Sequence, residues 1–122
     1  MSKNIIKEKS FKFAIRIVNL YQIIISEKKE FILSKQLLSS GTSVGANIRE
    51  AEHSESKADF IHKMAIAQKE INESIYWIDL LKETGYLNKD EYEGLNKDAI
   101  EIIKMITSII KTTKANLRRA NN

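Results

Sequence analysis

The chain contains no proline among its 122 residues. Apolar residues recur every three or four positions along four long segments of it. Proline breaks or kinks a helix, because its ring clashes with the preceding turn and it lacks the amide proton. The three-and-four spacing gathers apolar side chains on one face of a helix. The sequence therefore predicts an all-α protein built from long, uninterrupted helices.

The four segments cover about residues 4–26, 29–53, 57–84 and 89–118. The connections between them are short, about 3–6 residues, so consecutive helices should run antiparallel. A chain of this length can bury one hydrophobic core without disulfides, and it contains no cysteine. We expect a single domain over residues 1–122, folded as an antiparallel up-down-up-down four-helix bundle.

The first and fourth segments carry more apolar surface than a monomeric bundle needs. The first segment has a bundle seam with a second row beside it; the seam is Phe11, Ala14, Val18, Tyr21 and Ile25, and the second row is Phe13, Ile17, Leu20 and Ile24. The fourth segment is apolar around most of its circumference, with Ile100, Ile102, Ile103, Met105, Ile106, Ile109 and Ile110. A helix that is apolar on several sides is buried on several sides. The apolar surface of both helices therefore indicates self-association.

Two glycines, Gly41 and Gly45, lie in the middle of the second segment. Glycine is a poor helix former, so one interpretation is a kink or break at this point. The other is a continuous helix in which both glycines share one side and admit a neighbouring backbone. The apolar repeat keeps its phase through the glycines, which favours the continuous helix.

Several residues mark helix ends or polar contacts near the core. Ser56 followed by Asp59 resembles a capping box at the start of the third helix. Gly85 is typical of the residue just after a helix, and Asn88 is the expected N-cap of the fourth helix. Two amides close to the core rows, Asn47 and Gln68, are expected to bond each other across the second and third helices.

The net charge of +4 is unevenly distributed. Residues 1–16 hold five cations against Glu8 alone, and residues 102–122 hold five cations and no acid. In an up-down-up-down bundle, both chain termini lie at the same end of the bundle, together with an acidic turn near residues 50–59. This end is a candidate phosphate-binding surface, with Lys3, Lys7, Lys9, Lys12, Lys111, Lys114, Arg118 and Arg119 as the predicted contacts.

A structural explanation of the same charges competes with phosphate binding. Basic residues in a last helical turn suit the helix dipole, and lysine-rich termini aid solubility. The acidic turn, in the same or a neighbouring subunit, is also expected to neutralise part of the basic surplus.

The sequence offers little catalytic chemistry. Two carboxylate-x-x-His pairs, Glu50–His53 and Asp59–His62, recur in the spacing that di-metal bundles use. The first and fourth helices supply no acid at a matching depth, so we expect no metal. No phosphate loop or nucleophilic triad is present. We expect no enzyme, cofactor or small-molecule substrate.

The chain begins with polar, lysine-rich residues, and its longest apolar stretches are interrupted by charged and amide side chains. It therefore predicts neither a secretory signal nor a membrane span. A cytoplasmic location is expected.

A run from Ser43 to Glu50, Ser-Val-Gly-Ala-Asn-Ile-Arg-Glu, precedes an Asp-Phe pair. Over about residues 10–115 the chain resembles the four-helix-bundle family named for proteins encoded in 23S rRNA intervening sequences. The motif residues are Ser43, Val44, Ala46, Asn47, Ile48, Glu50, Asp59 and Phe60. Family members often carry proline at the position of Gly45, so a straighter second helix is expected here.

The resemblance implies a bundle that assembles into a homopentameric ring and has no established enzymatic activity. It also implies kinship with accessory proteins of diversity-generating retroelements, which contact nucleic acid and a reverse transcriptase. Two functional hypotheses follow. One is a non-catalytic ring that binds structured RNA or a ribonucleoprotein partner; the other is a structural or protein-interaction homo-oligomer without nucleic-acid affinity.

Overall fold

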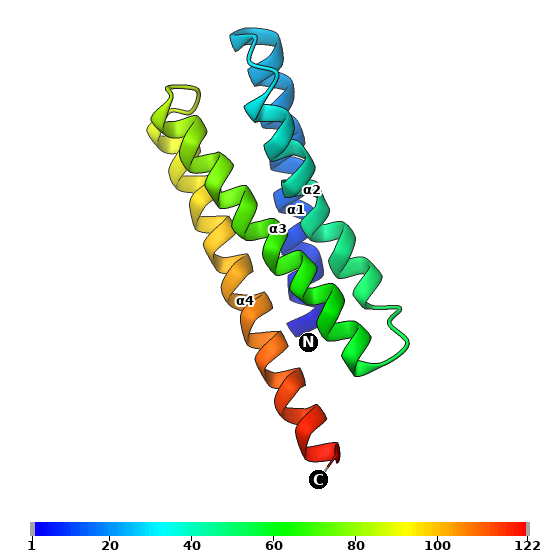
Figure 1. Ribbon diagram of the computed structural model, residues 1–122. Coiled ribbons are helices and arrows are strands. Elements are labelled where there is room, and N and C mark those ends of the chain that lie inside the picture. The colour runs from blue at the N-terminus through cyan, green and yellow to red at the C-terminus, as the bar shows by residue number, and fades with distance from the viewer. Residues whose placement is uncertain (1, 122) are drawn as a thin grey trace.

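The computed structural model describes the backbone of residues 2–121 and the side chains of residues 5–120. It contains four α-helices and one π-helical turn, and no strand within these residues (Figure 1). The helices are α1 (Ser2–Ile23), α2 (Leu33–Ala51), α3 (Lys57–Glu83) and α4 (Lys89–Asn121), and the π-helical turn η1 is Ile24–Lys28. The predicted all-α four-helix bundle is confirmed.

Consecutive helices run antiparallel, and α2 and α3 form the most extensive helix pair (Figure 1). Both chain ends and the α2–α3 turn lie towards the same end of the bundle. The last turns of α4 project beyond the other helices there. The predicted convergence of the two basic termini is therefore present, but the C-terminal part stands apart from the bundle.

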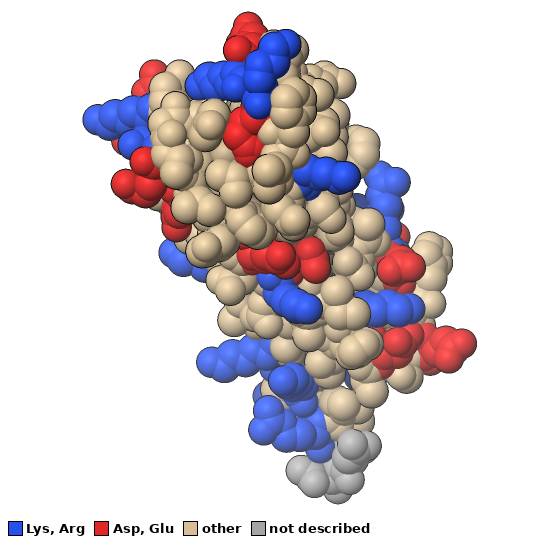
Figure 2. Space-filling view, turned by 45° about the horizontal axis from the view of Figure 1, so that its top comes forward, with Lys and Arg blue, Asp and Glu red and all other residues tan. Residues whose placement is uncertain are grey.

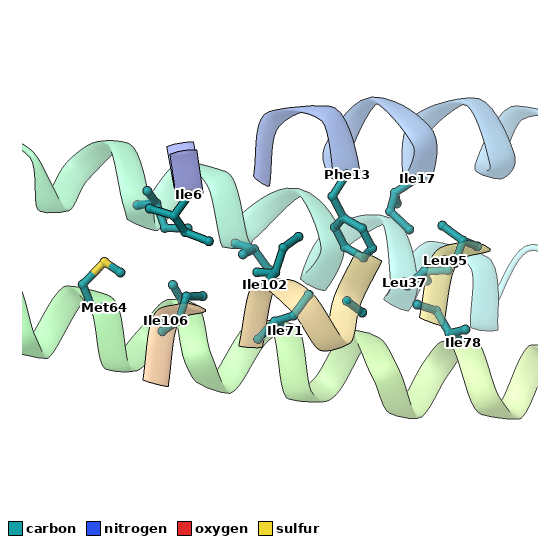
Figure 3. Packing of buried hydrophobic residues seen from close by; sticks show 14 of the residues in the cluster. Ile6, Phe13, Ile17, Leu37, Met64, Ile71, Ile78, Leu95, Ile102 and Ile106 are labelled. Carbon is teal, nitrogen blue, oxygen red and sulfur yellow. The ribbon is translucent and has the colours of Figure 1, made fainter. Parts of the chain in front are cut away.

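The core selects the second apolar row of α1 and not the predicted seam. Phe13, Ile17 and Ile24 are each 1% exposed, whereas Phe11 is 51% exposed. Figure 3 shows Phe13 and Ile17 pointing into the bundle, towards side chains of the other helices. Both rows are apolar, so periodicity alone could not distinguish them. The row that begins at Phe11 therefore remains partly exposed.

Most isoleucines of α4 pack inside the bundle of the single chain. Ile102, Ile106, Ile109 and Ile110 are buried, and Ile103 is partly buried against the core. This helix packs against both α1 and α3, so several of its sides are covered. Its own bundle therefore covers most of the apolar surface of this helix, and self-association stays a prediction.

The helix α2 begins at Leu33 and not near residue 29, so residues 29–32 connect it to η1. The chain leaves η1 through Lys29, which adopts a left-handed backbone conformation with φ of 54°. The Glu30 carboxylate then accepts hydrogen bonds from the backbone amides of Ile32 at 2.8 Å and Leu33 at 3.0 Å. A buried glutamate therefore satisfies the first free amides of α2, a role that no sequence motif indicated.

The predicted N-caps of α3 and α4 are confirmed. The backbone amide of Asp59 donates to Ser56 Oγ at 3.0 Å, and the Asp59 carboxylate accepts from the Glu55 amide at 3.2 Å. At α4, the Glu91 amide donates to Asn88 Oδ1 at 2.8 Å, and the Asn88 amide donates to Glu91 Oε1 at 2.9 Å. Both helices therefore start where the capping residues predict.

The end of α3 is also confirmed. Gly85 has a φ of +88°, the left-handed conformation that glycine adopts most easily. The following amide, from Tyr86, donates to the Leu81 carbonyl at 2.8 Å, and the Gly85 amide donates to the Lys82 carbonyl at 3.2 Å. This is the hydrogen-bond pattern of a Schellman motif, which turns the chain towards α4.

The helix α2 runs through both glycines without a break. A Cβ atom built at Gly41 would lie 2.9 Å from Ile17 Cγ1, closer than packed atoms come. At Gly45 it would lie 3.4 Å from the Ser10 carbonyl oxygen, an ordinary contact. The glycines therefore admit the backbone and side chains of α1, and the interpretation as a continuous helix is confirmed.

The predicted bond between Asn47 and Gln68 is not formed. Asn47 Nδ2 donates to the Ser43 carbonyl of its own helix at 2.8 Å, and Gln68 Nε2 donates to Thr107 Oγ1 of α4 at 2.9 Å. The prediction was wrong because Gln68 lies on the α4 side of α3. The polar contact that does join α2 to α3 is a buried hydroxyl pair, Ser74 Oγ to Ser40 Oγ at 2.9 Å.

Candidate nucleic-acid interface

The predicted basic residues of α1 lie beside acidic partners. The ion pairs are Lys7–Glu52 at 3.2 Å, Lys9–Glu101 at 3.1 Å and Lys12–Glu8 at 3.0 Å, and Arg16 pairs with Asp98. The expected neutralisation by the α2–α3 turn is present in the Lys7–Glu52 pair. Lys3 lies in α1, but its side chain is outside the described residues. Much of the positive charge of α1 is therefore balanced locally.

The predicted basic residues of α4 are different. Lys111, Lys114, Arg118 and Arg119 are all exposed, and none forms an ion pair with a described residue. Figure 2 shows Lys and Arg side chains gathered towards the lower end of the molecule, where α4 projects. The unbalanced part of the predicted surface is thus the C-terminal half of α4.

A regular spacing extends this surface along the helix. Four exposed cations follow one another at intervals of seven residues: Lys97, Lys104, Lys111 and Arg118. Seven residues fall about 20° short of two helical turns, so these side chains form a nearly straight row about 31 Å long. Lys114 lies between the last two on the same side. We call these five residues the α4 cation row.

Sequence reasoning missed two members of the α4 cation row. Lys104 lies within the basic C-terminal block but was not selected, and Lys97 lies in the acidic middle of the chain. The spacing of seven was the signal that could have identified both. The row has no acid interspersed from residue 102 onwards.

The motif residues of α2 and α3 serve the fold more than an exposed site. Val44, Ile48 and Phe60 are buried in the core. Asn47 bonds to its own helix, as does Ser43, whose hydroxyl donates to the Ser39 carbonyl at 2.8 Å.

Two other motif residues, Ala46 and Glu50, are exposed. Glu50 forms no side-chain hydrogen bond or ion pair with a described residue. On α3, burial raises the pKa of Glu70, and the neighbouring Glu73 carboxylate adds to this effect. These acidic side chains would repel phosphate, so the motif itself is not the candidate interface.

The two carboxylate-histidine pairs do not converge on a metal centre in the described part of the chain. His53 and His62 are both exposed. Asp59 is already engaged: hydrogen bonding to the Glu55 amide, and then to Lys63 at 3.3 Å, lowers the pKa of its carboxyl. Among the described residues, no group of three or more His, Cys, Asp or Glu side chains could hold an ion.

Within the described residues, no helix has the length and hydropathy that a membrane span requires.

Comparison with known proteins gives a consistent result. A family model described as 23S rRNA-intervening sequence protein matches residues 2–108. A crystal structure at 1.70 Å resolution of a protein of unknown function from the S23 ribosomal protein family of Bacteroides thetaiotaomicron VPI-5482 is 56% identical. It covers 91% of this chain and 99% of its own, with a TM-score of 0.90. No curated protein matches the sequence.

Proposed function

We propose that this chain, which belongs to the 23S rRNA-intervening sequence protein family, is a non-catalytic, ring-forming bundle that binds structured RNA or a ribonucleoprotein partner in the cytoplasm. The α4 cation row is the observation that carries the proposal. RNA binding is consistent with the description of the family, but its support here is the charge arrangement of the helix.

An exposed, unpaired row of cations suits the phosphate backbone. Each phosphate that a lysine or arginine neutralises releases condensed counterions, which drives sequence-independent binding. The cations of α4 have no acidic partner among the described residues, so they need not break an ion pair first. The lysines of α1 can also contact phosphate, because breaking an exposed ion pair costs only about 0–1 kcal/mol. We therefore place the principal contact on α4 and a secondary one on α1.

A salt titration of RNA binding tests this proposal. The double variant Lys104→Gln/Lys111→Gln should reduce the slope of log affinity against log salt by about 1.8 for duplex RNA or about 1.4 for a single strand. The matched control is Lys35→Gln/Lys89→Gln, which removes two exposed cations near the opposite end of the bundle. Equal slopes for the two double variants would contradict the proposed role of α4.

The ring is proposed on the exposed face of α1. Four large apolar side chains lie there at 44–51% exposure: Ile5, Phe11, Ile15 and Ile23. A groove of about 300 Å³ runs beside Phe11, with Ala14, Gly45 and Ala46 among its lining residues. A ridge next to a groove of small residues suits contact with another copy, and the family resemblance favours a pentamer.

Light scattering of the intact chain tests self-association. We expect a particle several times larger than the 14.0 kDa chain at micromolar concentration. Phe11→Glu/Ile15→Glu should shift it to the monomer without unfolding, because both residues are about half exposed in the single chain. Tyr76→Glu, an exposed aromatic residue on α3, is the control. A wild-type monomer, or equal dissociation by the control, would overturn the α1 interface.

The alternative function is a structural or protein-interaction homo-oligomer without nucleic-acid affinity. The ion pairs of α1 favour it, because part of the basic surplus is already balanced by acidic side chains of the same bundle. The salt titration separates the two functions: absent or salt-independent RNA binding by the wild-type protein would leave only this alternative.

A further inference from the structure

A pocket of about 430 Å³ lies between the α2–α3 turn and the C-terminal half of α4. This volume falls within the range of small-ligand sites, about 300–1,000 Å³. Its floor is apolar and buried, formed by Ala51, Phe60 and Ile109. Its walls are mostly polar. An apolar floor below polar walls suits a flat, heteroatom-rich group.

One wall carries a row of polar groups that are free to bind. Ser108, Thr112 and Asn116 line the pocket at four-residue intervals along α4. All three are exposed, and none makes a side-chain hydrogen bond with a described residue. The Thr113 hydroxyl, in contrast, already donates to the Ile109 carbonyl at 2.7 Å. Two hydroxyls and one amide therefore offer donors and acceptors above the apolar floor.

The charge at the pocket rim is favourable for phosphate. Lys57 lines the pocket from the first turn of α3 and has no ion-pair partner among the described residues. Arg119 follows Thr112 by seven residues, so it lies on nearly the same side of α4. The acid that lines the pocket is Glu52, which is paired with Lys7 at 3.2 Å.

We infer that this pocket accepts the base of one unpaired nucleotide of the bound RNA. The base would lie on the apolar floor, its edge would bond to the α4 wall, and Lys57 and Arg119 would contact the flanking phosphates. Proteins commonly read RNA through unstacked bases in this way. A helix is only about 10–12 Å wide, so an RNA on the α4 cation row can reach around the projecting end of α4.

This inference rests on the proposed RNA binding and is tested with two RNAs. One is a fully paired hairpin, and the other is the same hairpin with a single-nucleotide bulge. The wild-type protein should bind the bulged hairpin about tenfold more tightly, the lower range of what burying one base contributes. Thr112→Leu should abolish that preference, because it replaces the central hydroxyl of the α4 wall with a bulkier apolar side chain that cannot bond to the edge of the base. Its binding to the paired hairpin and its salt slope should not change.

The control is Ala115→Leu, which introduces the same side chain on the same stretch of α4 but outside the pocket lining. It should keep the preference for the bulge. Leucine is a good helix former, and Thr112 is exposed, so the Thr112 variant should remain folded. Equal wild-type affinity for the two hairpins, or a preference that survives in Thr112→Leu, would overturn the pocket alone. No binding to either hairpin would instead overturn the proposed function, and the pocket with it.

Discussion

Gly41→Leu should lower the free energy of unfolding by about 3 kcal/mol, the upper part of the usual range for overpacking. Even the Cβ atom of leucine would lie 2.9 Å from Ile17 Cγ1 and 3.1 Å from Ile17 Cγ2. Ile17 cannot move aside easily, because its side chain is β-branched and only 1% exposed. The two helices must therefore separate, which also weakens the packing of Phe13. A thermal melt at fixed chain concentration should show a decrease of about 10 °C.

Two variants on the same helix make this result specific. Ser39→Leu adds a leucine on the exposed side of α2 and should change stability by no more than about 0.5 kcal/mol. Gly45→Ala should be neutral or stabilising by up to about 1 kcal/mol, because its Cβ has room at 3.4 Å and alanine is the better helix former. A melting temperature of Gly41→Leu at or above that of the wild type would show that close approach is not needed.

The contrast between these glycines shows what the sequence could and could not predict. The unbroken apolar repeat correctly indicated a continuous α2 and a close neighbour. It could not distinguish Gly41, which meets a buried isoleucine, from Gly45, which meets a backbone carbonyl at ordinary contact distance. Local signals were reliable for the same reason: Ser56, Gly85 and Asn88 act on amides and carbonyls within one helical turn.

Predictions that depended on the choice of partner were less successful. Two apolar rows on α1 both have the helical spacing of three and four, so spacing alone did not show that the row containing Phe13 packs against α2 and α4. The same limit applies to Gln68, whose partner Thr107 lies on α4 and not on α2.

The candidate interface was predicted in part. Net charge identified the C-terminal half of α4, because that segment contains no acid. Pairing with the acidic turn that contains Glu52 was expected from the sequence, but the Lys9–Glu101 pair joins residues of α1 and α4 and required the fold. Lys97 was missed because a count of charge by segment hides a row that crosses segments. Periodicity applied to charge, as well as to hydrophobicity, would have revealed it.

Glu30→Ala should lower the free energy of unfolding by about 2 kcal/mol, because it removes a charged cap from the start of α2. The carboxylate accepts from three consecutive backbone amides, those of Ile32, Leu33 and Ser34. Ile32 is 76% exposed, so water can replace the lost bond there, but Ser34 is only 2% exposed. Its amide would remain without an acceptor, and the buried start of α2 would fray.

The chemistry of this cap is tested by a graded series in urea. Glu30→Gln keeps an amide oxygen but loses the charge, so it should lose about 1 kcal/mol, between the wild type and alanine. Glu27→Ala, an exposed acid in η1 that makes no side-chain hydrogen bond with a described residue, is the control and should have little effect. Unfolding midpoints should shift at constant slope, and amide exchange at Leu33 and Ser34 should accelerate in Glu30→Ala. If alanine and glutamine at this position both stay within about 0.5 kcal/mol of the wild type, the start of α2 is held by the packing of Leu37 and its neighbours and not by the Glu30 carboxylate.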